Sequence, residues 1–354
     1  MPVTVVVGGQ FGGEGKGKVA HYLAREMNAK AAVRVGGSNS GHTVIDPLGN
    51  ALILRHLPTP SILPDVMCIL GAGSYIDVDI LFDEIDRTGL TADRLLIDPN
   101  AVVVTRDEIT TEMNSTLRSS IGSTQSGTGA AVIRRISRDG SVRLARDDER
   151  LKPFVMPVVP YMRNLLSNGE RIIVEGTQGF GLSLLHTPHY PFATSRDTSA
   201  SAFVSEAGLS PLDVDDIVLV IRTYPIRVGG NSGPLTNEID WSVVTKNCGQ
   251  QHKIEEFTSV TKTLRRVGHI DMSLLVAAIE VNNPTKIVLN HIDYLDHEVT
   301  CNVYSDKIYD FIRAIEQYAN RKIDYLGFDR LSIIKNNCTE YNLKKEHDSV
   351  PYDK

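Results

Sequence analysis

The residues best suited to chemistry lie in a glycine-rich segment, residues 8–18, which reads GGQFGGEGKGK. This segment directly follows an apolar run and precedes a stretch typical of a helix. Glycines at such a junction let the backbone approach a ligand closely, and a helix N-terminus presents free N–H groups to an anion. Gly12 to Lys18 also fit the pattern G-x-x-x-x-G-K of phosphate-cradling loops, although Val19 stands where Ser or Thr would hold magnesium. We therefore expect a phosphate site here rather than a flexible surface turn.

A second glycine-rich segment, residues 36–43 (GGSNSGHT), also follows an apolar run. It contains His42, and a lone histidine in a loop is more often a surface or capping residue than a catalytic one. Because this histidine follows a second glycine loop, we expect it to reach phosphate chemistry as an acid or as a stabiliser of charge.

The elements that must position these loops follow from the apolar periodicity. Short β-branched runs predict strands, and amphipathic stretches predict helices. The expected strands span residues 3–7, 31–35, 67–70, 171–174, 217–221 and 286–289, and the expected helices span 19–27, 77–88, 271–280 and 306–318. Strands alternating with helices predict an α/β fold with a mostly parallel central sheet flanked by helices on both faces. The mixed-charge stretch 134–150 is expected to form an exposed excursion.

The domain organisation is expected to be simple. A length of 354 residues sets a prior of two domains, although α/β folds of this size often form one. No internal repeat, low-complexity tract or long linker divides the chain, and the motif positions run from residue 10 to about 330. We therefore expect one elaborated domain at 1–340 followed by a tail at 341–354.

Composition excludes several classes of function. The chain is 42% hydrophobic and 23% charged, which is ordinary for a globular protein, and its net charge of −6 argues against broad nucleic-acid binding. Its four cysteines form no C-x-x-C pair, so neither a zinc ribbon nor a disulfide framework is predicted. No apolar run is long enough for a membrane span and the N-terminus lacks a basic n-region, which favours a cytoplasmic protein. The lysines inside the first glycine loop, with no well-placed G-x-G-x-x-G, argue against a dinucleotide fold.

The two glycine segments together resemble the signatures of the adenylosuccinate synthetase family, G-x-Q-W-G-D-E-G-K-G-K and G-G-x-N-A-G-H-T. The resemblance continues collinearly to about residue 330. The further matching segments are IGST at 121–124, EGTQG at 175–179, YPFATS at 190–195, RVG at 227–229, the aspartate-binding loop at 256–271 and LNHID at 289–293.

This resemblance implies a P-loop-NTPase-like α/β domain and a two-step ligase reaction. Such enzymes phosphorylate O6 of a purine monophosphate with a nucleoside triphosphate and Mg²⁺, and the amine of L-aspartate then displaces the phosphate. Catalysis is therefore positioning plus charge neutralisation. A homodimer is also implied, with no direct role for nucleic acid or membrane.

The resemblance also assigns roles to residues. Lys16 and the loop backbone would hold the γ-phosphate, His42 would stabilise the transferred phosphoryl group, the Gly41 carbonyl would ligate Mg²⁺, and Gln178 would face the purine base or its O6-phosphate. Thr124 and Thr194 would hold the 5′-phosphate, helped by an arginine from a partner subunit, aligned here with Arg138, although Arg134, Arg135 and Arg143 lie close in sequence. The positions carried over for binding substrates and nucleotides are Gly12, Gly13, Glu14, Gly15, Gly17, Lys18, Asn39, Gly41, Thr43, Ser123, Thr124, Arg138, Thr194, Val228, Thr261, Thr263, Arg265, Arg266, Asn290, Asp293 and Gly327.

The most informative departure from the family is Gly13, where the housekeeping enzymes carry an aspartate that removes the N1 proton of inosinate and contacts Mg²⁺. A guanine nucleotide has the same O6/N1–H lactam plus an amine on C2, which a side chain packed against N1 would crowd. Glycine here resembles the viral branch of the family, whose enzymes join aspartate to deoxyguanylate on the way to 2-aminoadenine. The alternatives are an ordinary synthetase acting on IMP with a displaced base, and an inactive nucleotide-binding paralogue.

Two further departures bear on the substrates. Thr263 replaces an arginine that contacts the ribose 2′-hydroxyl, which suits a deoxyribose or is a neutral loop substitution, while Arg265 and Arg266 would grip the incoming carboxylates. His291 replaces the lysine that helps to read guanine, so ATP or dATP is the expected phosphoryl donor, with Asp293 accepting from an exocyclic amine. Phe328 would pack on the donor base or lie in the core. The expected base for the N1 proton is a carboxylate of the bound aspartate, Glu14 or a phosphate-bound water.

Overall fold

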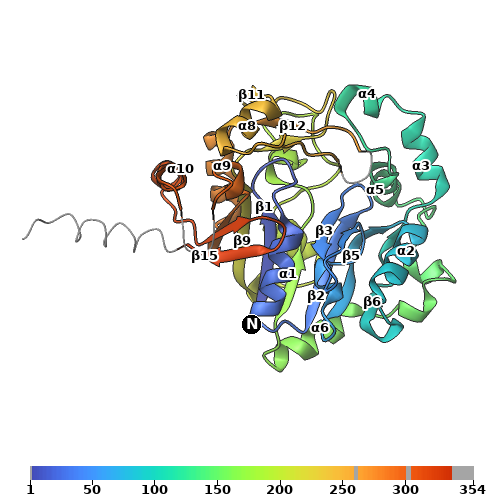
Figure 1. Cartoon of the computed structure of the whole chain (residues 1–354). Helices are drawn as coiled ribbons and strands as arrows, with labels where there is room; N and C mark the ends of the chain where they lie inside the picture. The colour runs from blue at the N-terminus through green and yellow to red at the C-terminus, as the bar shows by residue number, and fades with distance from the viewer. Residues whose placement is uncertain (1, 259–261, 300–303, 337–354) are drawn as a thin grey trace, which may run out of the picture.

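The computed structural model describes residues 2–258, 262–299 and 304–336 (Figure 1). Its centre is a sheet ordered β15-β14-β13-β9-β1-β8-β2-β5-β6, with the short β7 paired to β5. All pairs are parallel except β14 with β15. The strands span β1 Val3–Gly8, β2 Ala31–Gly37, β5 Met67–Ile76, β6 Leu95–Ile97, β7 Val102–Val103, β8 Ile172–Glu175, β9 Val214–Arg222, β13 Lys286–Asn290, β14 Tyr325–Phe328 and β15 Ser332–Lys335.

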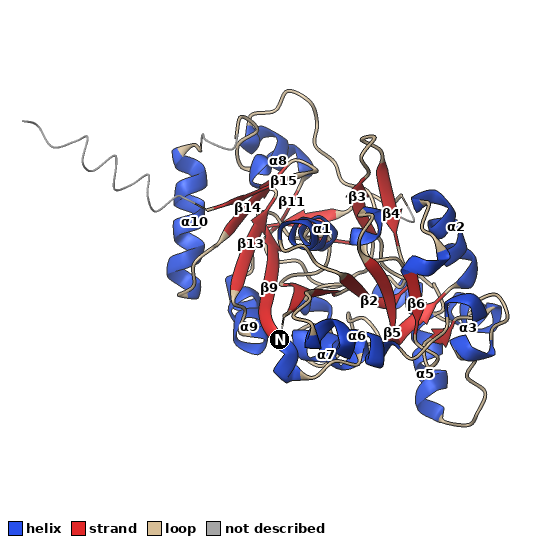
Figure 2. Ribbon diagram, turned by 90° about the horizontal axis from the view of Figure 1, so that it is seen from below, coloured by secondary structure: helices blue, strands red, loops and turns tan. Residues whose placement is uncertain are grey.

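Helices cover both faces of this sheet, as the alternation of apolar residues in β1 requires. Val5 packs into the core that contains α6, α7 and α9, whereas its neighbour Val6 packs into the core that contains α1. Figure 2 shows the same division, with α1 on one side of the sheet and α6, α7 and α9 on the other. The helices span α1 Lys16–Glu26, α2 Val78–Thr88, α3 Arg106–Met113, α4 Leu117–Ile121, α5 Thr128–Ser137, α6 Val158–Ser167, α7 Ala200–Ala207, α8 Trp241–Cys248, α9 Met272–Asn282 and α10 Asp306–Ala319.

Local chemistry sets the ends of these helices. Asp77 caps α2 by accepting from the Ile80 amide at 3.2 Å, and Gly89 ends it in the left-handed conformation at φ 63°. Asp271 caps α9 in the same way through the Leu274 amide at 3.0 Å. A short polar acceptor before the first turn and a left-handed residue after the last satisfy groups that the helix itself leaves unpaired.

The fold class expected from the sequence is confirmed: the chain forms a single α/β domain with a large, mostly parallel sheet flanked by helices. Every expected strand and helix is present, most of them within a few residues of the expected bounds. The first helix begins at Lys16 rather than at residue 19, because Gly15 takes a left-handed conformation (φ 90°) that ends the loop. The strand expected at 67–70 continues to Ile76.

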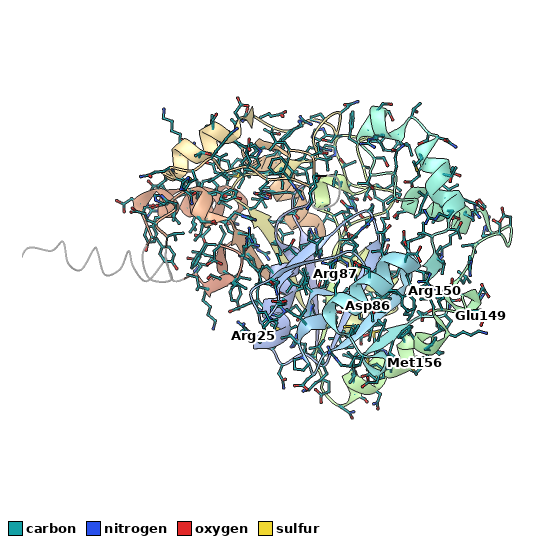
Figure 3. The ribbon with its side chains drawn as sticks, turned by 45° about the vertical axis from the view of Figure 1, so that its right-hand side comes forward. Arg25, Asp86, Arg87, Glu149, Arg150 and Met156 are labelled. Carbon is teal, nitrogen blue, oxygen red and sulfur yellow. The ribbon has the colours of Figure 1, made fainter. Side chains whose placement is uncertain are left out.

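The expected excursion at 134–150 is wrong in its first part, because residues 134–137 form the last turn of α5. Beyond Ser137 the chain is a mostly exposed loop, and Figure 3 places Glu149 and Arg150 at the surface. The expected tail at 341–354 lies outside the described residues. Among the described residues, no helix is both long and apolar enough to cross a membrane.

The parallel sheet positions the site. In parallel strands all carboxyl ends meet at one edge, which is where open α/β sheets bind ligands. The segments that follow β1, β2, β8, β9, β13 and β14 therefore converge there. Two small sheets frame this edge: β3 (His42–Ile45) with β4 (Ala51–Leu54), and β10 (Ile226–Arg227) with β12 (Arg266–Gly268) and β11 (Glu238–Ile239).

Candidate active site

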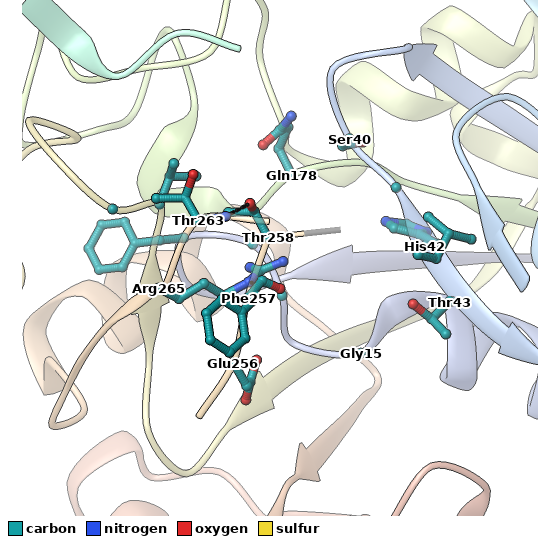
Figure 4. A pocket seen from close by; sticks show the side chains of 18 of the residues that line it. Gly15, Ser40, His42, Thr43, Gln178, Glu256, Phe257, Thr258, Thr263 and Arg265 are labelled. Carbon is teal, nitrogen blue, oxygen red and sulfur yellow. Dashed lines mark hydrogen bonds between the residues drawn. The ribbon is translucent and has the colours of Figure 1, made fainter. Parts of the chain in front are cut away.

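One pocket of about 1020 Å³ lies at the carboxyl edge of the sheet (Figure 4). It contains the first glycine loop, the second glycine loop with His42, Gln178 after β8, and the loop that carries Thr263 and Arg265. Gln178 and His291 line it from left-handed backbone conformations, at φ 59° and 62°. Non-glycine residues take this conformation at a cost, and such strain concentrates at functional sites.

Glu14 stabilises the first glycine loop, residues 8–18, from inside; this segment is called the phosphate loop below. Its carboxylate is fully buried and accepts from the Gln10 amide at 3.1 Å, the Gly12 amide at 2.8 Å and Lys16 Nζ at 2.7 Å. These bonds hold the loop open around the start of α1, where free amides face an anion. Glu14 is thus committed to the loop and does not line the pocket, which corrects the expectation that it is a candidate base for the substrate.

Asn290, at the end of β13, supports the same loop. Its side-chain amide donates to the Glu14 carbonyl at 2.7 Å, and the residue is fully buried. A Cβ atom added to Gly327 in β14 would lie only 1.8 Å from Asn290 Oδ1. Both positions were expected to contact a nucleotide, but neither lines the pocket. Gly327 instead leaves the space that Asn290 needs.

His42 is held by a buried carboxylate. Glu175 Oε1 lies 2.5 Å from His42 Nδ1 and 2.5 Å from Arg34 Nη1, while Glu175 Oε2 accepts from the amide and hydroxyl of Thr59, both at 2.8 Å. Burial, with the adjacent charge of Arg34, lowers the pKa of His42 to about 3 in spite of Glu175. The ring is therefore neutral at neutral pH, with one nitrogen fixed by Glu175 and the other available to a ligand. A phosphoryl dianion beside it would favour the protonated form.

Gly13 leaves no space behind it for a side chain. Its φ is +71°, and a Cβ atom there would lie 2.6 Å from Ile226 Cδ1 and 3.0 Å from Arg265 Nη1. Ile226 in β10 pairs with Val267 in β12. Val267 directly follows Arg265 and Arg266 in the chain. The region is therefore built around glycine, with an apolar side chain and a guanidinium where a carboxylate would stand.

The expected aspartate-binding loop places its two arginines differently. Arg265 lines the pocket, and its backbone amide donates to the Glu256 carbonyl at 2.8 Å. Arg266 points elsewhere: its guanidinium binds the Glu238 carboxylate and donates to the Gly233 carbonyl at 2.7 Å. Of the two arginines expected to face the incoming carboxylates, only Arg265 lines the pocket, and its role there stays a prediction. Thr263 lines the pocket, and Thr261 lies outside the described residues.

The other end of the pocket is formed by Lys18, His291, Asp293 and Arg330. Lys18 Nζ donates to the carbonyls of Phe328, Asp329 and Ser332, at 3.2–3.3 Å, and so ties α1 to the β14–β15 turn. Burial lowers the pKa of Lys18 to about 8, against the opposing charges of Asp293 and Asp329. Within the described residues Asp293 Oδ1 is buried without a hydrogen-bond partner. An unpaired buried acceptor is costly, and a ligand amine would satisfy it.

Most of the expected site residues therefore come together. Those that line the pocket are Gly12, Gly13, Gly15, Lys16, Gly17, Lys18, Asn39, Gly41, His42, Thr43, Ser123, Thr124, Gln178, Val228, Thr263, Arg265 and Asp293. Thr194 lies just behind the wall, where its amide donates to the carbonyl of the lining residue Leu182 at 2.8 Å. Arg138 caps α5 at φ 55°, is exposed and does not line this chain's pocket. Its role at a partner's site stays a prediction.

Sequence reasoning missed several residues that face or support the pocket. Arg118 lines it beside Ser123 and Thr124, and Tyr294 lines it next to Asp293. Glu256 lines it and binds the buried Arg222. Arg118 lies three residues before the IGST segment, and Tyr294 directly follows LNHID, so proximity to these motifs is the one signal that pointed to them.

The magnesium ion expected from the sequence would have to be held mainly by substrate phosphates. No group of three His, Cys, Asp or Glu side chains is arranged as a metal site in the described part of the chain. Mg²⁺ keeps several waters and is commonly bound by substrate phosphates with few protein ligands. The Gly41 carbonyl, beside His42 at the phosphate loop, is the protein ligand expected here. When bound, the ion would neutralise charge on the transferred phosphoryl group.

Comparison with known proteins agrees with this geometry. A sequence model of the family described as adenylosuccinate synthetase matches residues 5–146 and 141–329. The chain is 38% identical to the adenylosuccinate synthetase of Methanococcus aeolicus over 328 residues, covering 90% of this chain and 94% of that protein. It is 34% identical to the enzyme of Methanocaldococcus jannaschii over 325 residues, covering 90% and 91%.

Two solved structures share the fold. The succinoaminodeoxyadenylate synthetase of cyanophage S-2L, bound to dGMP and to dATP as an energy donor, superposes with a TM-score of 0.81 at 28% identity, covering 98% of this chain and 99% of that one. A fully ligated adenylosuccinate synthetase from Plasmodium falciparum superposes with a TM-score of 0.82 at 20% identity, covering 95% and 100%.

Proposed function

The chain belongs to the adenylosuccinate synthetase family of carbon–nitrogen ligases, and we propose that within this family it joins L-aspartate to C6 of dGMP. The γ-phosphoryl group of ATP or dATP would pass to O6 of the guanine with loss of the N1 proton. The amine of aspartate would then attack C6 and expel the phosphate. The products are N6-succino-2-amino-2′-deoxyadenylate, ADP or dADP, and inorganic phosphate.

The observation that carries this proposal is the environment of Gly13. No side chain projects from it toward the purine, and Ile226 and Arg265 occupy the space behind it. The site therefore has no carboxylate at this position to crowd a base with an amine on C2, and its neighbours leave no room for one. The likeness to a phage enzyme bound to dGMP supports the same reading, whereas the archaeal relatives are named for adenylosuccinate formation and make IMP the alternative substrate.

The completeness of the site favours an enzyme over an inactive binding protein. The phosphate loop is braced, and His42 is fixed by Glu175 within the pocket. Lys16 and the free amides of α1 would hold the γ-phosphate, while His42 would stabilise the phosphoryl group in flight. Ser123 and Thr124, with Arg118, form a cradle suited to a 5′-phosphate.

The N1 proton requires a base, and the position of Arg265 favours the bound aspartate. A guanidinium near position 13 would bring a substrate carboxylate close to the purine N1. Glu256 lines the same region but is a poor base: burial acts to raise its pKa, yet the charge and hydrogen bonds of Arg222 outweigh this and hold the pKa at about 2.

The donor end supports ATP or dATP. Asp293 presents an unpaired acceptor suited to an exocyclic amine. Burial, with the charge of Arg222 adding to it, holds the pKa of His291 well below its ordinary value, so this residue adds no positive charge for the guanine O6. The phage neighbour, whose structure contains dATP as energy donor, supports the same choice.

The test is release of inorganic phosphate with L-aspartate and Mg²⁺, comparing dGMP with IMP and comparing ATP, dATP and GTP. We expect turnover with dGMP and either adenine donor. Turnover with IMP but not dGMP would show an ordinary synthetase, and nucleotide binding without turnover would show an inactive paralogue.

A further inference from the structure

Glu256 lies where three parts of the pocket meet. Its carboxylate binds both terminal nitrogens of Arg222 and accepts from the Tyr294 hydroxyl at 3.0 Å. Arg222 Nη1 also donates to the Gly13 carbonyl at 2.9 Å. The Glu256 carbonyl accepts from the Arg265 amide at 2.8 Å. One residue thus contacts, directly or through a single partner, three separate segments of the chain.

Each segment serves a different ligand of the proposed reaction. Tyr294 follows Asp293 at the donor-base end of the pocket. Gly13 belongs to the phosphate loop beside the purine, and Arg265 belongs to the loop that would bind aspartate. In Figure 4, Glu256 lies at the base of the loop that carries Phe257, Thr258, Thr263 and Arg265.

The link between these segments is stiff because it is an ion pair whose arginine is fully buried, although the Glu256 side chain is 21% exposed. Arg222 is fully buried, and the pKa of Glu256 is held at about 2, so this pair is ionised at every pH at which the protein would work. Burial, with the charge of Glu256 adding to it, raises the pKa of Tyr294, so its hydroxyl remains a donor. Removing one partner of a buried ion pair leaves an uncompensated charge, which makes movement of one segment without the others costly.

We propose that Glu256, with Arg222 and Tyr294, is a positioning residue that couples the binding of the nucleoside triphosphate to the binding of the monophosphate and aspartate. Filling the donor end fixes Tyr294. This orders Glu256, which in turn fixes the Gly13 carbonyl and the start of the aspartate loop. The coupling rests on the proposed function for the identity of the ligands. It is reciprocal, so the monophosphate tightens donor binding by the same factor.

The first test uses Tyr294→Phe, which removes only the hydroxyl. Isothermal titration measures the Kd of the non-hydrolysable donor β,γ-imido-ATP with Mg²⁺, with and without saturating dGMP. We expect dGMP to tighten donor binding about 10-fold in the natural protein and less than about 3-fold in the variant, each factor being the ratio of that protein's own Kd values without and with dGMP. Tyr161→Phe in α6, outside the pocket, is the matched hydroxyl deletion. In this control, dGMP should still tighten donor binding by the same factor as in the natural protein.

The second test uses Glu256→Gln, which removes the charge but keeps the shape. We expect it to raise KM for L-aspartate about 10-fold or more while kcat falls less, because the residue touches no reacting atom. Asp213→Asn breaks a different arginine–carboxylate pair, Arg163 with Asp213, which lies at the amino end of β9 and does not line the pocket. This variant should lower the free energy of unfolding but leave KM for aspartate unchanged.

The outcomes separate this inference from the proposed function. An absent coupling in the natural protein, a full factor in Tyr294→Phe, or an equal rise of KM in Asp213→Asn would each overturn the positioning role. If the natural protein turns over IMP rather than dGMP, the proposed function fails, and the same titrations with IMP still decide whether Glu256 couples the two ends.

Discussion

At the scale of single residues, the proposed preference for dGMP depends on Gly13. The family aspartate is absent, and the surroundings leave no room for it, since Ile226 and Arg265 lie 2.6 Å and 3.0 Å from where a Cβ atom would stand. A left-handed φ of +71° adds a further cost for any side chain, although aspartate tolerates it better than most residues do. Introducing the carboxylate alone should therefore not produce efficient turnover of IMP.

We expect Gly13→Asp to abolish turnover of dGMP without yielding efficient turnover of IMP, because the new side chain overlaps Ile226. Adding Ile226→Ala should relieve that overlap and raise IMP turnover by about 10-fold or more over the single variant. Phosphate release with each nucleotide measures both effects, and Ile226→Ala alone serves as the control for lost packing. Efficient IMP turnover by Gly13→Asp alone would show that Ile226 does not set the preference.

His42 is the residue expected to contribute most to the rate. His42→Asn should lower kcat about 100- to 1000-fold, as removal of a group that stabilises transition-state charge does. The Kd of dGMP should change little, since the histidine acts on the phosphoryl group. The exposed His252→Asn is the control. Loss of dGMP binding in parallel with kcat would instead indicate a role in shaping the pocket.

At the scale of elements, Lys18 joins the first helix to the β14–β15 turn through three carbonyls. Lys18→Met should lower the free energy of unfolding by about 1–3 kcal/mol, because three carbonyls, two of them in partly buried hydrogen bonds, lose their charged donor. It should also weaken binding of the donor nucleotide, because that turn carries Asp329 and Arg330 into the pocket. Lys30→Met also removes a lysine charge, near the end of α1 and outside the pocket. It should change neither the free energy of unfolding nor the binding of the donor nucleotide.

These elements also show what a sequence can and cannot predict. The buried strands β1, β2, β8, β9 and β13 were predictable because continuous β-branched runs have few other solutions. The short strands β6, β7, β14 and β15, at or near the edges of the sheet, were not, since two to four residues carry too little periodicity. The helices between residues 106 and 137 were missed because their exposed faces mix polar and apolar residues, as Ile133 and Ile136 show.

The same distinction holds for the site. Residues inside glycine motifs, such as Lys16 and His42, were found because the loop itself requires their spacing. The directions of Glu14 and Arg266 were not predictable, because a motif does not say which side of a loop faces the ligand. The Arg222–Glu256 pair joins residues 34 positions apart, and only the folded chain brings them together.

For the whole molecule, stability should depend on acid in a predictable direction. Burial, with nearby arginine charges, lowers the pKa values of both His42 and His56 to about 3. The unfolded chain binds these protons near pH 6.5 and the folded chain does not, so stability is lost as the pH falls from about 6.5 toward 3. The slope should be about 1.4 kcal/mol per pH unit for each histidine.

Urea unfolding between pH 7 and pH 4 measures this slope. In the natural protein His56 Nε2 accepts from the Asp77 amide at 3.1 Å, and His56→Gln retains an acceptor there. The variant should reduce the slope by about 1.4 kcal/mol per pH unit, which is the contribution of one proton. A variant slope equal to that of the natural protein would show that His56 is protonated within the fold.

The preference for dGMP over IMP is the central claim for the molecule, and a competition assay tests it most directly. Equal concentrations of the two nucleotides are supplied with ATP, Mg²⁺ and L-aspartate, and mass spectrometry quantifies the two succinyl products, whose ratio gives the ratio of kcat/KM. We predict that N6-succino-2-amino-2′-deoxyadenylate exceeds adenylosuccinate by about 10-fold or more. An excess of adenylosuccinate would contradict the account and make this chain an ordinary synthetase that works without the aspartate at position 13.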